Sequence, residues 1–149
     1  MIDRRIGALA LSAIVLAAPG CGKSSKPLTR AQLISQADAI CKRVNAKLKV
    51  SKINSKQDIA RVVPQLATYE QQALADLGKL VPPASMANDW KTIVAGAQTL
   101  ADNTAKLGEY AKENKLKAAR GLVSTSEKVQ QQVQATAKRD GFKECSQNA

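Results

Sequence analysis

The clearest helical pattern in the chain lies in residues 81–112, VPPASMANDWKTIVAGAQTLADNTAKLGEYAK. The Pro82-Pro83 pair ends any helix before it, because proline has no N–H to donate and its ring clashes with the preceding turn. Beyond it, apolar or small residues recur at alternating steps of four and three: Met86, Trp90, Ile93, Ala97, Leu100, Thr104, Leu107 and Ala111. This heptad spacing is typical of a helix that packs lengthwise against other helices. It predicts a helix over about residues 84–112.

An apolar stripe at helical spacing also occupies the first part of the chain. It predicts a helix over about residues 30–50. Thr29 fits its N-cap and Gln32 the partner three residues on, since the two side chains can each bond the other residue's backbone N–H.

A further stripe predicts a helix that begins after Ser55 and continues to Leu77. We expect Ser55 to cap this helix through Asp58. Pro64 lies inside the stripe, so we expect the helix to be kinked or split at that residue.

The last stripe predicts a helix over about residues 115–140, with Asn114 as its cap. Gly141 fits the left-handed position that ends a helix, and Phe142 fits the apolar contact after it. The residues expected to face inward are Leu116, Ala119, Val123, Ser126, Val129, Val133 and Ala137.

No segment alternates with the period of two that a half-buried strand shows. We therefore predict an all-α fold, an antiparallel up-and-down four-helix bundle over residues 30–149, because short connections join neighbouring antiparallel helices. The helix seams are rich in Ala, Ser and Thr, which lets helices approach closely and leaves little room for a large buried ligand.

The N-terminal residues 16–25, LAAPGCGKSS, match two incompatible motifs. A phosphate-binding loop needs a helix directly after it, and Pro27 stands inside that segment. A lipoprotein signal peptide instead accounts for the residues before Cys21. Arg4 and Arg5 form its positive start, and an apolar run follows over residues 6–18 that is too short to span a bilayer.

We therefore expect residues 1–20 to be a lipoprotein signal peptide and Cys21 to be the lipid attachment site. The protein would then be exported and anchored at the outer face of the cell membrane, with residues 21–29 as a polar tether. Cleavage by an ordinary signal peptidase after Gly20 is the alternative, and it would give a secreted protein.

Two cysteines remain when Cys21 is lipidated. Outside the cytoplasm an isolated pair is typical of a disulfide, so we expect Cys41 and Cys145 to be bonded. The rival is a pair of free thiols or a redox site, which usually has its cysteines two residues apart.

The amino-acid composition excludes several classes of catalytic and metal-binding site. It contains no histidine, which excludes His-based catalytic triads and most zinc sites. No convergent catalytic group stands out, so we expect no enzymatic activity, no metal site and no cofactor.

The net charge of +11 is unevenly distributed. Residues 42–61 carry +6 and residues 106–120 carry +3, and in an up-and-down bundle both segments surround turns at the end opposite the anchor. We expect a basic tip there, consisting of Lys47, Lys49, Lys52, Lys56, Lys112, Lys115, Lys117 and Arg120.

Two functional hypotheses follow from this charge. Either the basic tip contacts anionic wall polymers or an acidic protein, or it is only a solvated face. Nucleic acid is not expected as a partner, because no aromatic residues interleave with the basic ones to stack bases. The alternative function is binding of a small ligand in a groove near the second and third helices, close to Pro64, Tyr69 and Trp90.

Three stretches of the sequence are similar to segments of a known protein family: ADAICKRVNAKL at residues 37–48, LGKLVPPASMANDW at 77–90 and GFKEC at 141–145. Together with the signal peptide, they make the chain resemble small helical, disulfide-containing lipoproteins of actinobacteria. That family has no assigned activity. The resemblance therefore implies an envelope location and a helical fold, and it implies no mechanism.

Overall fold

The computed structural model describes residues 26–50 and 55–147, and this part of the chain is helical with no strand. The elements are α1 (Arg30–Val50), α2 (Lys56–Leu77), the short 3-10 helix η1 (Ala84–Met86), α3 (Ala87–Lys112) and α4 (Leu116–Asp140). The predicted four-helix bundle is thereby confirmed. The signal peptide, Cys21 and Lys52 lie outside the described residues.

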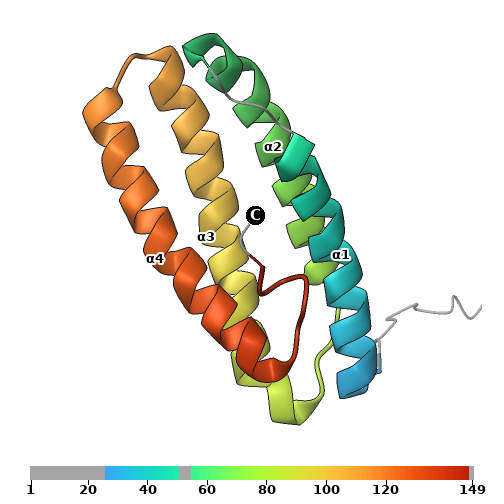
Figure 1. Cartoon of the computed structure of the whole chain (residues 1–149). Helices are drawn as coiled ribbons and strands as arrows, with labels where there is room; N and C mark the ends of the chain where they lie inside the picture. The colour runs from blue at the N-terminus through green and yellow to red at the C-terminus, as the bar shows by residue number, and fades with distance from the viewer. Residues whose placement is uncertain (1–25, 51–54, 148–149) are drawn as a thin grey trace, which may run out of the picture.

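Consecutive helices run in opposite directions along the bundle (Figure 1). α1 packs on α2, α2 on α3, and α3 on α4. α3 therefore has a helical neighbour on two sides, which agrees with its long heptad seam. The C-terminal tail, residues 141–147, turns back from the end of α4 and lies beside α1.

Side-chain caps set where the first two helices begin. Thr29 N–H donates to Gln32 Oε1 at 2.9 Å, and Gln32 N–H donates to Thr29 Oγ1 at 3.3 Å. Asp58 N–H donates to Ser55 Oγ at 3.1 Å. Both predicted caps are confirmed, and each satisfies a backbone donor that the first turn of a helix leaves without a partner.

Pro64 does not split α2, which continues without a break from Lys56 to Leu77. The structure corrects the expectation of a split, while a kink at this residue stays a prediction. The Thr68 hydroxyl donates to the Pro64 carbonyl oxygen at 3.0 Å. α2 packs on both α1 and α3, and such tertiary packing stabilises a helix beyond its own propensity.

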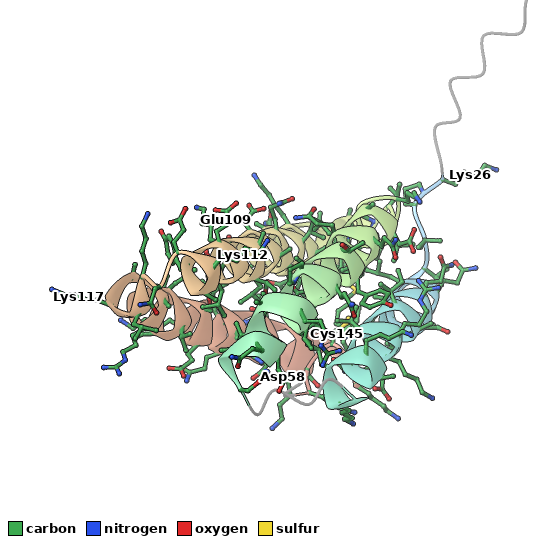
Figure 2. All side chains as sticks on the ribbon, turned by 90° about the horizontal axis from the view of Figure 1, so that it is seen from above. Lys26, Asp58, Glu109, Lys112, Lys117 and Cys145 are labelled. Atoms are coloured by element: carbon green, nitrogen blue, oxygen red, sulfur yellow. A yellow bond between two sulfur atoms is a disulfide. The ribbon has the colours of Figure 1, made fainter. Side chains whose placement is uncertain are left out.

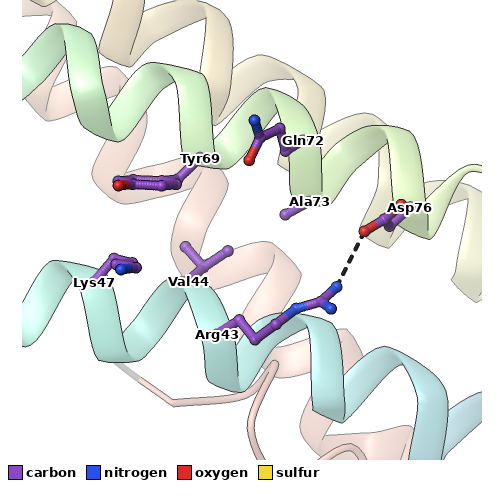
Figure 3. A pocket seen from close by; sticks show the side chains of 7 residues that line it. All are labelled: Arg43, Val44, Lys47, Tyr69, Gln72, Ala73 and Asp76. Atoms are coloured by element: carbon purple, nitrogen blue, oxygen red, sulfur yellow. Dashed lines mark hydrogen bonds and ion pairs between the residues drawn. The ribbon is translucent and has the colours of Figure 1, made fainter.

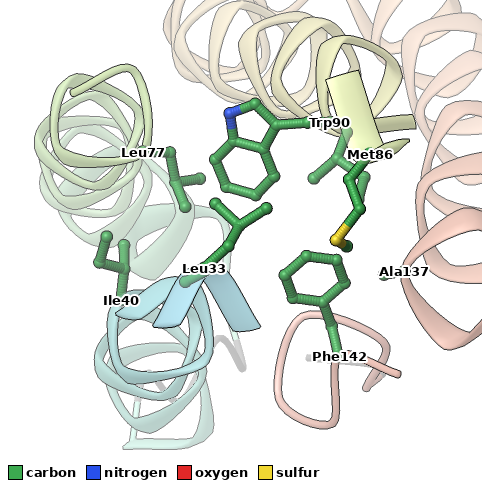
Figure 4. Close-up of a cluster of buried hydrophobic side chains, with 9 residues drawn as sticks. Leu33, Ile40, Leu77, Met86, Trp90, Ala137 and Phe142 are labelled. Carbon is green, nitrogen blue, oxygen red and sulfur yellow. The ribbon is translucent and has the colours of Figure 1, made fainter. Parts of the chain in front are cut away.

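A continuous apolar core fills the half of the bundle near the start of α1 (Figure 4). The rings of Trp90 and Phe142 stack with their centroids 5.9 Å apart, and the two residues are 5% and 2% exposed. Phe142 reaches the core because Gly141 ends α4 with a φ of 86°, the left-handed conformation that glycine adopts without strain. The other core residues are Leu33, Ala37, Ile40, Leu77, Met86, Ile93 and Ala137.

Small residues bring α3 and α4 close together, as the seam predicts. A Cβ added at Gly96 would overlap Val133 Cγ2. Two helical turns further along α3, Asn103 Nδ2 donates to Ser126 Oγ at 3.0 Å across the same interface. At this interface the backbone of α3 at Gly96 therefore lies directly against the Val133 side chain of α4.

Two residues expected to face inward on α4 are exposed instead. Leu116 is 58% exposed and Val123 is 43% exposed. α4 packs mainly on α3, and the tail covers only the half of α4 near its C-terminal end. The apolar stripe was read correctly as helical, and the prediction of burial along its whole length was wrong.

The tail is clamped to one face of α1. The Asp38 carboxylate accepts hydrogen bonds from the three backbone amides of residues 143–145 at 2.9, 2.9 and 3.2 Å. Cys41 and Cys145 form the predicted disulfide, and Asn45 Nδ2 donates to the Glu144 carbonyl oxygen at 2.9 Å. The tail therefore attaches α1 to the end of α4, where Arg30 Nη2 of α1 also donates directly to the Asp140 carbonyl oxygen at 2.9 Å.

Candidate functional site

Those predicted basic residues that the structure describes lie around two turns, which we call the basic end of the bundle. One is the last turn of α1, and the other joins α3 to α4; Figure 1 places both at the same end of the molecule. The exposed members of this set are Lys47, Lys49, Lys112, Lys115, Lys117 and Arg120. Lys56 is the first residue of α2.

The α3–α4 turn is built around a left-handed residue. Asn114 has a φ of 60°, and the Lys115 N–H donates to the Tyr110 carbonyl oxygen at 2.9 Å. This is the hydrogen-bond pattern that ends a helix at a left-handed position. Asn114 thus closes α3, and the N-cap position of α4 belongs to Lys115, which corrects the expected cap.

An ion pair neutralises one of the positive charges at the α3–α4 turn. Lys115 Nζ lies 2.6 Å from Glu113 Oε2, and this hydrogen bond raises the pKa of Lys115. Lys112, Lys117 and Arg120 form no ion pair with the described residues. These three side chains therefore carry the net charge of the turn.

The two turns of the basic end lie on different sides of the bundle axis. Figure 2 shows Lys112 and Lys117 on the side of α3 and α4, while α1 ends on the far side of the bundle axis. The structure therefore brings the basic residues to one end without joining them into one compact cluster. A ligand that contacts both turns has to be extended.

A groove of about 310 Å³ lies between α1 and α2, next to the basic end (Figure 3). Val44 and Ala73 form its apolar floor. Its polar groups come from both helices: Arg43 and Lys47 from α1, and Tyr69, Gln72 and Asp76 from α2.

Asp76 lies at one end of this groove and is held by two cations. Its carboxylate is 3.1 Å from Arg43 Nη2 and 2.9 Å from Lys79 Nζ. The hydrogen bond from Lys79, that residue's charge and the nearby Arg43 lower the pKa of Asp76. Asp76 is therefore ionised throughout the neutral pH range, and it fixes the direction in which Arg43 points.

Lys47 and Tyr69 occupy the opposite end of the groove. Lys47 Nζ lies 5.2 Å from the centre of the Tyr69 ring, in the range of a cation–π contact. Tyr69 is 38% exposed, so its ring is a wall of the groove that solvent reaches. The groove thus has a cationic aromatic end and a carboxylate end.

The predicted alternative site is only partly present. Tyr69 lines the groove, but Trp90 is buried in the core against Phe142 and Pro64 does not line the groove. The groove lies between α1 and α2, whereas a groove was expected near the second and third helices. Trp90 is on the heptad seam, where large apolar side chains pack into the core.

Sequence reasoning missed Gln72 and Asp76 and used Arg43 only as part of a charge run. A signal for them exists in the spacing. Tyr69, Gln72 and Asp76 recur at steps of three and four, which puts them on one face of α2, and Arg43 and Lys47 are one turn apart on α1. Two such polar faces that meet beside a short connection indicate a groove with polar walls.

The described residues contain no group of three or more Cys, Asp or Glu side chains placed to hold a metal ion. Of the helices in residues 26–50 and 55–147, none is both long and apolar enough to cross a membrane. The chain matches no protein-family model, and its comparison with curated proteins and with solved structures gives no match.

Proposed function

We propose that this protein is a lipid-anchored protein of the cell envelope whose basic end binds an anionic wall polymer or an acidic protein. Export and attachment through Cys21 at the outer face of the membrane are part of the proposal, and so is the likeness to actinobacterial lipoproteins. The protein would act by binding, without an enzymatic step.

The placement of the basic end is the observation that carries this proposal. The chain enters the fold at the start of α1, where Leu28 N–H donates to the Val81 carbonyl oxygen at 2.9 Å. The 21 residues of α1 extend about 31 Å along the helix axis from that point. An anchor that precedes α1 would therefore leave the basic end facing away from the membrane.

Mass spectrometry of the protein from its native envelope tests the anchor. The expected result is a mature chain that begins at Cys21 and carries a diacylglycerol on its sulfur. A cleaved chain with an unmodified Cys21 would overturn the anchor and leave a secreted protein.

Binding of the mature protein to fluorescent polyglutamate, a linear polyanion, tests the basic end. Reversal of Lys49, Lys117 and Arg120 to Glu should weaken binding by about tenfold or more, a change of about 1.4 kcal/mol. The matched control reverses Lys91, Lys128 and Lys138 to Glu, which changes the net charge equally away from the two turns. Arg139 is left out because its guanidinium pairs with Asp89 at 2.6 Å.

Both binding affinities should fall as salt is added, because exposed charges are screened within about 8–10 Å at physiological ionic strength. Only the basic-end variant should lose most of its affinity at a fixed salt concentration. Equal losses in the two variants would reduce the proposal to attraction by net charge.

A further inference from the structure

We propose that the groove between α1 and α2 binds a sugar unit that carries an anionic group, either a carboxylate or a phosphate. This inference rests on the proposed function, since it names the unit of the anionic polymer that the protein recognises. It adds a specific site to a surface that otherwise attracts any polyanion.

The size and lining of the groove fit one sugar unit. Its volume of about 310 Å³ is at the lower end of the range for small-ligand sites. The Tyr69 ring offers a flat apolar wall against which the C–H face of a pyranose can lie, and Val44 lies beneath it (Figure 3). The Gln72 amide and the Asp76 carboxylate supply the donor and acceptors that sugar hydroxyls require.

The charges at the two ends of the groove argue for an acidic sugar in one orientation. Asp76 accepts hydrogen bonds and repels anions, so it favours hydroxyl groups at its end. Lys47 lies at the other end, over the face of Tyr69. An anionic substituent would pair with Lys47, while the hydroxyls on the opposite side of the ring reach Asp76. A neutral sugar would not use the positive charge of Lys47, and a free anion would not contact Tyr69 or Asp76.

The α1 wall of the groove is held in place from behind. Asp38, Cys41 and Asn45 fasten α1 to the tail. At about 100° per residue, Arg43 and Lys47 point roughly to the opposite side of α1. The clamp therefore fixes the rotation of α1 and, with it, the two basic side chains that face α2.

Nuclear magnetic resonance of the ¹⁵N-labelled full-length mature protein tests this inference. The probes are glucuronate and glucose 6-phosphate, and the controls are glucose, acetate and inorganic phosphate. We expect an acidic sugar to shift the side-chain amide signals of Gln72 and the Arg43 Nε–H signal saturably, with an affinity about tenfold or more above that of every control. Response to glucuronate alone would assign a carboxylate, and response to glucose 6-phosphate alone a phosphate.

Four variants connect the signals to the groove. Tyr69→Leu should weaken binding of the acidic sugar by about tenfold, whereas Tyr69→Phe should keep it, because the ring remains. Lys47→Gln should weaken binding, and Lys42→Gln, on the same helix and outside the groove, should not. Thermal unfolding by circular dichroism checks that each variant is folded.

The inference is overturned if no probe shifts Gln72, if acetate or phosphate binds as well as the acidic sugars, or if Tyr69→Leu binds normally. None of these groove results depends on the polyglutamate assay, because Tyr69→Leu leaves every charge unchanged. Failure of the wild-type protein to bind polyglutamate through its basic end would therefore contradict the proposed function separately.

Discussion

Glu70 is a carboxylic acid that the fold holds largely away from water between α2 and α3. Its Oε2 atom is buried and has no hydrogen-bond partner among the described residues. Burial raises the pKa of Glu70, and a hydrogen bond from Thr104 opposes this effect without cancelling it. The folded state therefore favours the protonated form of this side chain.

A raised pKa in the folded state makes Glu70 a source of pH-dependent stability. The native protein binds this proton more tightly than the unfolded chain does. The stabilisation is full below the ordinary glutamate pKa of 4.5 and is lost as the pH rises through the raised value. Relative to Glu70→Gln, the wild-type protein should lose free energy of unfolding between acidic and neutral pH.

Urea unfolding of the two proteins across this pH range measures the difference directly. Thr104 is unchanged in both, and the Gln side chain keeps the shape of the site. A difference between wild type and Glu70→Gln that stays constant with pH would contradict an elevated pKa.

At the scale of the element, the α3–α4 interface depends on the absence of a side chain at Gly96. An alanine there would overlap Val133 Cγ2, and valine has little freedom to rotate away inside a helix. Gly96→Ala should lower the free energy of unfolding by about 1–3 kcal/mol, the usual cost of overpacking. Thermal or urea unfolding measures this loss.

Gly121 provides the matched control, since it also lies inside a helix but a Cβ there meets no atom within 4 Å. Gly121→Ala should stabilise the protein by about 0.5–1 kcal/mol, because alanine loses less chain entropy than glycine on helix formation. The double variant Gly96→Ala with Val133→Ala should recover part of the loss. Equal effects at the two glycines would disprove the close contact.

Helix positions could be predicted from the sequence because local rules fix them. The Thr29 and Ser55 caps, the Pro-Pro turn and Gly141 each act within a few residues, and the structure confirms all four. Asn114 shows how two local rules compete. It was expected to cap the following helix, yet its left-handed conformation ends the preceding one.

Features that depend on which helices are neighbours could not be predicted in the same way. Leu116 and Val123 continue the apolar stripe of α4, and only the arrangement of the bundle leaves them exposed. The groove likewise forms where the polar faces of α1 and α2 meet, and neither face identifies its partner. The disulfide was the one long-range contact that could be predicted, because only two cysteines remained to form it.

At the scale of the whole molecule, the tail strengthens the attachment of α1 to α4, which meet directly where Arg30 Nη2 donates to the Asp140 carbonyl oxygen. The Cys41–Cys145 bond connects residues 104 positions apart. In the chain-entropy model, a loop of this length contributes about 4–5 kcal/mol. The double variant Cys41→Ser with Cys145→Ser should lose a free energy of unfolding of this order, while its helix content in the cold stays near that of wild type.

Circular dichroism against temperature, with and without a reducing agent, measures this contribution. The reducing agent should lower the melting temperature of the wild-type protein and leave that of the double variant unchanged. A wild-type protein whose melting temperature is insensitive to reduction would show that the hydrogen bonds of Asp38 and Asn45 hold the tail without help from the disulfide.

The central claim is that the protein binds an anionic polymer with one end of its bundle. Mapping backbone amide shifts while polyglutamate is added to the ¹⁵N-labelled mature protein tests this claim most directly. We predict that the shifts concentrate in the last turn of α1 and in residues 112–120, whereas residues 87–91 and 138–140 at the other end stay unchanged. Shifts spread evenly over all exposed lysines, or concentrated near residues 87–91 and 138–140, would contradict it.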